Sequence, residues 1–138
     1  MAPRDLFEYV DPPGAMRITR GSYVAVVPQG ITDTDRLLDT LSLRLKFPGY
    51  FGSNWNALVD CLGDFSWIPD PCDIVLLHED VPQILRIDLV QYIGVLDGAA
   101  HSWLPGERHK LVVGFPMSCR DEVERVLLEA RAWPARTE

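Results

Sequence analysis

The sequence predicts an α/β fold in which a small three-stranded parallel sheet is packed by helices. Continuous apolar and β-branched runs at residues 23 to 27, 73 to 77 and 110 to 115 are typical of buried strands. Segments with apolar residues at helical spacing separate these runs. Strands that alternate with helices favour a parallel sheet, and a length of 138 residues suits one core. We therefore expect a single domain over residues 1 to 138.

Both ends of the chain extend beyond this expected core. Residues 6 to 10 fit either a short strand or a turn of helix, and the prolines and glycine at residues 12 to 14 break the pattern. We expect residues 1 to 21 to form an N-terminal extension at the edge of the domain. Residues 118 to 138 are expected to form a C-terminal helix, with Ser118 and Asp121 as a capping box.

Three further helices are expected between the strands. The first begins at Asp33 or Thr34 and ends before Pro48. The second is short, from about residue 54 to residue 62, with Asn54 as its N-cap. The third is clearest from residue 88 to residue 103. The apolar positions expected to face the core are Leu37, Leu38, Leu41 and Leu45 in the first helix, and Leu89, Tyr92, Ile93, Leu96, Ala100 and Trp103 in the third.

The distribution of charge indicates a basic partner. The formal net charge is -7, and residues 47 to 85 contain no Lys or Arg. A negative potential of this kind attracts a basic protein and speeds their encounter, although an ordinary solvated acidic side explains the charge equally well. Direct binding to nucleic acid is not expected, because phosphate contacts need Lys and Arg. The acids of this segment are Asp60, Asp64, Asp70, Asp73, Glu79 and Asp80.

The sequence predicts no catalytic residue, no cofactor and no metal site. Residues 78 to 82 begin like a zinc-protease motif, but Pro82 stands where the second His is required. Neither a phosphate-binding glycine loop nor a Gly-x-Ser-x-Gly elbow occurs. The three cysteines are far apart in the sequence, which favours free, buried thiols. With no apolar run of about 20 residues and no secretory signal at the start, we expect a cytoplasmic protein without a membrane segment.

Residues 47 to 62 form the most distinctive stretch of the chain. Turn residues open it, and Tyr50, Phe51 and Trp55 bring three aromatic rings close together in sequence. The short helix that follows should show two faces. Ala57, Leu58, Cys61 and Leu62 should point inward, and Asn56, Val59, Asp60 and Gly63 should point outward. An aromatic loop followed by a helix with an acid facing out is typical of a surface that binds a partner rather than of a reaction centre.

Residues 50 to 62 resemble the signature of the barstar family, proteinaceous inhibitors of bacterial ribonucleases. The order of strands and helices is also similar, and the resemblance covers about residues 22 to 117. It implies a barstar-like fold with a three-stranded parallel sheet. It also implies a non-catalytic inhibitor whose acidic, aromatic loop and helix block the basic active site of a ribonuclease. The expected function is therefore that of an immunity protein against a ribonuclease toxin.

The resemblance also implies which residues contact the partner. Asp60 matches the central acid of the family and is expected to contribute most. The contacts carried over by position are Tyr50, Gly52, Asn54, Trp55, Asn56, Val59 and Asp60, with Asp64 and Phe65 just beyond the helix.

Two departures from the family pattern leave the partner's identity open. Asn56 stands where the family commonly has Asp, and Val59 replaces an aromatic residue. One negative charge is therefore missing, and whether Asp64 or another acid replaces it stays open. The alternative to a ribonuclease is another basic protein, such as a DNase toxin or a regulatory partner. The sequence does not predict an oligomeric state.

Overall fold

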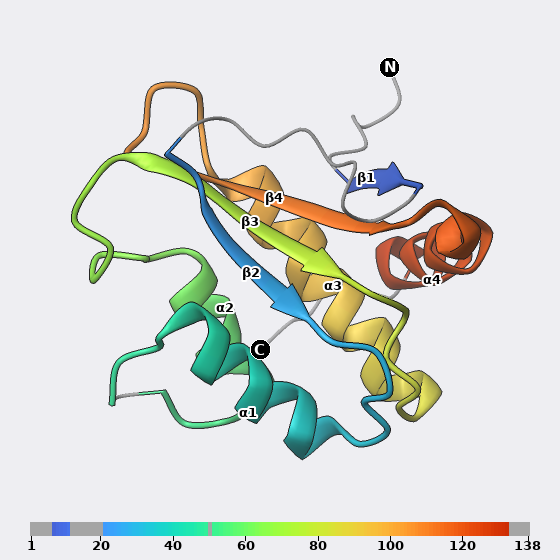
Figure 1. The fold of residues 1–138 in the computed structure, drawn as a ribbon. Coiled ribbons are helices and arrows are strands. Elements are labelled where there is room, and N and C mark those ends of the chain that lie inside the picture. The colour runs from blue at the N-terminus through green and yellow to red at the C-terminus, as the bar shows by residue number, and fades with distance from the viewer. Residues whose placement is uncertain (1–6, 12–20, 50, 133–138) are drawn as a thin grey trace.

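The structure, a computed structural model, describes residues 7–11, 21–49 and 51–132. Along these residues the helices and strands alternate, as expected for an α/β fold (Figure 1). In chain order they are β1 (Phe7–Val10), β2 (Tyr23–Val27), α1 (Thr34–Leu45), α2 (Trp55–Leu62), β3 (Cys72–His78), α3 (Arg86–Ser102), β4 (His109–Pro116), a short 3-10 helix η2 (Met117–Cys119) and α4 (Arg120–Ala132).

The sheet has four parallel strands in the order β1-β4-β3-β2, so the expectation of three strands was wrong. The three predicted strands form β2, β3 and β4. The fourth is β1 from the N-terminal extension, which pairs with β4 so that Phe7 lies opposite Val113. Four residues are too few for an alternating pattern to distinguish a strand from a helical turn. Burial of Phe7, whose ring lies 5.7 Å from that of Phe115, fixes the strand instead.

One main core lies between the helices and one face of the sheet. It combines alternate residues of the strands, such as Ile74 and Leu76 of β3, with the apolar stripes of all four α-helices. The neighbouring strand residues Val75 and Leu77 belong to a smaller cluster with Val112. This division follows from the alternation of side chains along a strand.

The helix boundaries follow from local capping. Asp33 accepts a hydrogen bond from the Arg36 amide at 2.8 Å and starts α1, as predicted. Asn54 caps α2 in the same way. The predicted capping box at α4 does not form, because Ser118 lies inside η2 and α4 begins only at Arg120. Among the described residues, no helix is sufficiently long and apolar to cross a membrane.

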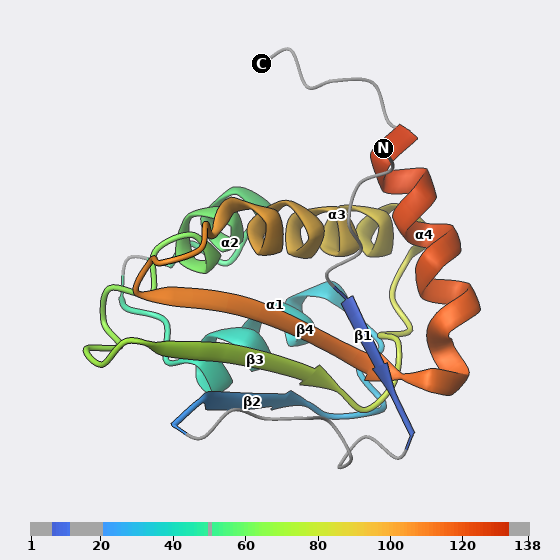
Figure 2. The same ribbon diagram turned by 90° about the horizontal axis from the view of Figure 1, so that it is seen from above.

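The C-terminal helix packs across α3 and completes the side of the molecule that carries β1 (Figure 2). The Arg131 guanidinium donates two hydrogen bonds to the Asp97 carboxylate, at 3.0 and 2.8 Å. Arg86 forms a second ion pair with Glu129 at 2.7 Å. In both views α4 lies at the end of the molecule opposite α2, so the C-terminal helix stands away from the most distinctive part of the sequence (Figures 1 and 2).

Candidate functional site

Residues 51 to 54, which lead into α2, are held in place by local hydrogen bonds. The Asn54 side-chain oxygen accepts from the Ala57 amide at 2.8 Å, and its amide nitrogen donates to the Gly52 carbonyl at 3.3 Å. Ser53 adopts the left-handed conformation, with φ of 54°. The Phe51 ring lies 4.8 Å from Phe47 and anchors the loop to the core. The start of α2 is therefore fixed before any partner arrives.

Helix α2 shows the two faces predicted from the sequence. Leu58, Cys61 and Leu62 are fully buried. Asn56 and Asp60 are exposed, and half of the Val59 surface is accessible. Among the described residues, none forms a hydrogen bond or an ion pair with the Asp60 carboxylate, so this charge is available to a partner.

The aromatic residues of the predicted site mostly support α2 rather than project from it. Trp55 is half-buried, and its ring lies 6.2 Å from that of Tyr92 in α3. Phe65 has no exposed surface, so its place among the expected contact residues was wrong. Its φ of 49° directs the chain sharply after α2, and its ring packs against Trp67 and Trp103 at 5.5 and 6.2 Å. Tyr50 lies outside the described residues.

The C-terminal end of α2 borders a hollow that the sequence did not indicate. The Trp103 indole N–H donates to the Leu62 carbonyl at 2.9 Å and ties the end of α3 to the end of α2. A hollow of about 440 Å³ opens beside this contact. Because its residues come from two separate segments, no local motif marks it. Its lining residues are Asp64, Ser66, Trp103, Gly106, Glu107, Arg108 and His109.

Two other acids of residues 47 to 85 serve the fold. Glu79 and Asp80 follow β3, and each accepts a backbone amide from the loop after β2. The donors are Gln29 and Gly30, both at 3.1 Å. These carboxylates hold the two loops together, so Glu79 and Asp80 have a structural role in the fold in addition to their negative charge.

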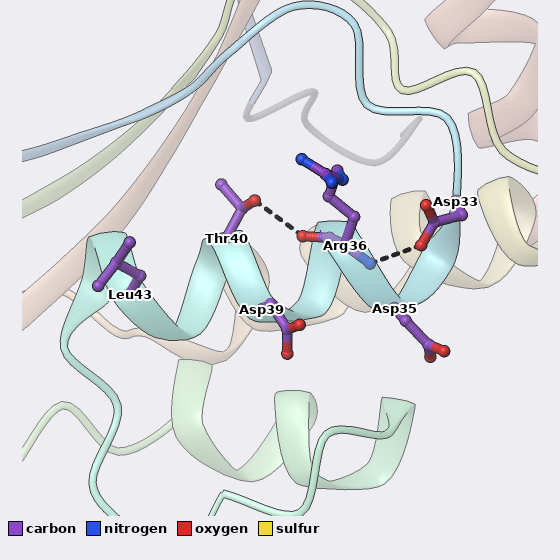
Figure 3. Close-up of a pocket in the computed structure, with 6 residues that line it drawn as sticks. All are labelled: Asp33, Asp35, Arg36, Asp39, Thr40 and Leu43. Atoms are coloured by element: carbon purple, nitrogen blue, oxygen red, sulfur yellow. Dashed lines mark hydrogen bonds between the residues drawn. The ribbon is translucent and has the colours of Figure 1, made fainter.

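Helix α1 carries a second acidic surface around a shallow hollow of about 450 Å³ (Figure 3). Asp35 and Asp39 point to the same side of the helix, as residues four apart must. Asp33 is occupied as the N-cap. Leu43 at the far end is 75% exposed. This surface adds negative potential, but it holds no buried group directed into the hollow.

His78, the first residue of the zinc-like motif, is a core residue. Its Nδ1 lies 3.0 Å from the Gly114 carbonyl and its Nε2 lies 2.6 Å from the Tyr92 hydroxyl. Burial lowers the pKa of His78 to about 4, against a smaller opposing effect of the Gly114 hydrogen bond. Over the described ranges, no group of three or more His, Cys, Asp or Glu side chains is arranged to hold a metal ion.

Helix α2 thus presents the Asp60 carboxylate and the half-exposed Val59 side chain at the surface. A family model described as Barstar (barnase inhibitor) matches residues 23–116, which is more than half of the chain. The chain belongs to the barstar family, whose members are inhibitors rather than enzymes. No curated protein and no solved structure gives a significant match. Strand β1 and helix α4 lie outside the matched residues.

Proposed function

We propose that this protein is a cytoplasmic immunity protein that inhibits a bacterial ribonuclease toxin. The loop before α2 and the outer face of α2 cover the toxin's basic active site. The observation that carries the proposal is the exposed carboxylate of Asp60, on a fixed helix within the residues that match the family. Asn56 and Val59 flank it on the same face and supply polar and apolar contact area.

The chemistry of the partner explains this arrangement. A ribonuclease binds a polyanion, so its active site carries cationic side chains. A carboxylate that enters such a site forms charge-assisted hydrogen bonds, which are about twice as strong as neutral ones. Because Asn54 and Trp55 are already held by the cap and by packing on Tyr92, little side-chain freedom is lost when α2 docks.

The direct test is calorimetric titration of the protein against barnase and against the ribonuclease encoded beside its own gene, with Asp60→Ala in parallel. We expect Asp60→Ala to weaken binding by at least about 2 kcal/mol, because it leaves cationic groups of the nuclease buried without a partner. Asp121→Asn on α4 removes a similar charge at the opposite end of the molecule and is the matched control.

A loss below about 0.5 kcal/mol for Asp60→Ala would show that another surface binds the nuclease. The second candidate function is binding of a different basic protein, such as a DNase toxin. The exposed amide at Asn56 favours it, since one charge expected of a ribonuclease inhibitor is missing. Titration of a DNase toxin under the same conditions separates the two, because the ribonuclease proposal requires the ribonuclease to bind more tightly.

A further inference from the structure

The turn before β4 lies at the same end of the molecule as α2. Both views place residues 104–108 and α2 at the end opposite α4 (Figures 1 and 2). The Trp103 hydrogen bond to Leu62 joins the two segments directly. The turn is exposed throughout, and Leu104 keeps 65% of its surface accessible. A protein that docks on α2 therefore has this turn within reach.

The hollow between α2 and the turn has two carboxylates in its lining. Asp64 follows the C-terminal end of α2, and Glu107 comes from the turn. One Glu107 oxygen accepts the Leu104 amide at 2.6 Å, which fixes the position of this carboxylate. The Trp103 side chain contributes a wall of the hollow. Two carboxylates in the lining of one hollow suit a cationic side chain, because opposite charges form charge-assisted hydrogen bonds.

The charge balance of the hollow is negative although it contains an arginine. Its lining contains two carboxylates, those of Asp64 and Glu107, and one guanidinium, that of Arg108. The carbonyl groups at the C-terminal end of α2 carry partial negative charge, although those of Val59, Cys61 and Leu62 accept hydrogen bonds. The hollow thus extends the negative surface of Asp60 along the axis of the helix, beyond the residues that the family signature covers.

We propose that the hollow beside Glu107 is a second contact site for the nuclease and accepts a Lys or Arg side chain from it. This inference rests on the proposed function, because it requires a basic protein docked on α2. The Glu107 carboxylate would then lie near the interface of a chain that has Asn56 where the family commonly has Asp. Charge complementarity and direct connection to α2 are what favour this occupant.

Two variants test the site, one that removes a negative charge and one that removes a positive charge. Glu107→Gln keeps an oxygen for the Leu104 amide and removes only the charge, whereas Arg108→Gln removes the competing cation. In calorimetric titrations against a ribonuclease that the unaltered protein binds, we expect Glu107→Gln to raise the Kd about threefold and Arg108→Gln to lower it by a similar factor at low salt. The matched controls are Asp121→Asn and Arg125→Gln, both at exposed positions of α4.

The outcomes separate this inference from the proposed function. Binding that is lost in Asp60→Ala but unchanged in both turn variants would overturn the second contact site and leave the inhibitor proposal in place. Equal effects of the turn variants and of the α4 controls would also overturn it, because only net charge would then matter. If the unaltered protein binds no ribonuclease, both proposals fail. Thermal unfolding of each variant confirms that the fold is intact.

Discussion

At the scale of single residues, the most unusual group is the imidazole of His78. A carbonyl oxygen only accepts hydrogen bonds, so Nδ1 must carry the proton that faces Gly114. Nε2 then accepts from the Tyr92 hydroxyl. The Phe115 ring stacks on the imidazole at 4.1 Å. Every polar atom of the neutral ring is satisfied, and a second proton on Nε2 would require the Tyr92 hydroxyl to accept this hydrogen bond instead of donating it.

This arrangement predicts a loss of stability in acid that can be measured. The folded pKa of His78 is about 4, below its ordinary value of 6.5, so the unfolded chain takes up a proton first as pH falls. The contribution of neutral His78 to the free energy of unfolding is complete above pH 6.5. It decreases between pH 6.5 and pH 4, by a total of about 3 kcal/mol. Urea unfolding at a series of pH values in this window measures the decrease.

The variant His78→Asn serves as the reference for this prediction. Asn keeps a donor for the Gly114 carbonyl and has no ring that titrates. The variant should be less stable at neutral pH, because the Tyr92 hydroxyl loses its acceptor, but its free energy of unfolding should fall less steeply in the same window. Parallel pH profiles of the two proteins would contradict the assignment of the titration to His78.

Single residues also show which features of the site could be predicted from the sequence and which could not. Asn54 and Asp60 could be predicted because a cap and an outward position follow from the spacing of one helix. Phe65 could not, since its burial depends on a left-handed turn and on Trp103 from a distant segment. Glu107 could not either, because it approaches Asp64 only when α3 and β4 are in place. Contacts within one turn of helix are visible in a sequence, and contacts between segments are not.

At the scale of elements, the N-terminal strand is the part of the fold that the sequence left undecided. Its four residues are extended by pairing with β4 and by burial of Phe7, neither of which a local pattern reveals. The central strands β3 and β4 carry longer apolar runs and were predicted correctly, because strands that are buried on both faces of the sheet need apolar residues at successive positions. The length of the apolar run decided the difference, because the edge strand β2, with five such residues, was also predicted.

The role of β1 leads to a prediction about stability. Phe7 is 5% exposed and packs against Phe115, so Phe7→Ala should lower the free energy of unfolding by about 3 kcal/mol. Glu8→Ala, on the exposed side of the same strand, should change it by less than about 0.5 kcal/mol. Chemical denaturation measures both. Similar values for the two variants would mean that β1 does not contribute to the core.

At the scale of the whole molecule, three arginines of α3 and α4 are engaged in ion pairs, whereas two carboxylates of α1 are not. The arginines 86, 120 and 131 form ion pairs with Glu129, Glu124 and Asp97. By contrast, Asp35 and Asp39 on α1 have no ion-pair partner among the described residues (Figure 3). Both side chains point to the same side of α1, so this side of the helix presents two carboxylates to solvent even though Arg36 and Arg44 belong to the same helix.

These two carboxylates should act on the rate of association with a basic nuclease. The double variant Asp35→Asn with Asp39→Asn should lower the association rate about threefold at low salt and leave the dissociation rate unchanged, because these carboxylates attract the partner without touching it. The control is Asp121→Asn with Glu122→Gln, which removes the same formal charge from α4, at the end of the molecule opposite α2.

Stopped-flow mixing at increasing salt distinguishes steering from contact. If Asp35 and Asp39 act only through the field, the difference between the α1 variant and the unaltered protein should disappear above about 0.5 M salt, where charges are screened within a few ångströms. A faster dissociation of the α1 variant, persisting at that salt, would instead place α1 inside the interface. The negative surface of α1 would then belong to the binding site together with Asp60, and the nuclease would cover two helices rather than one.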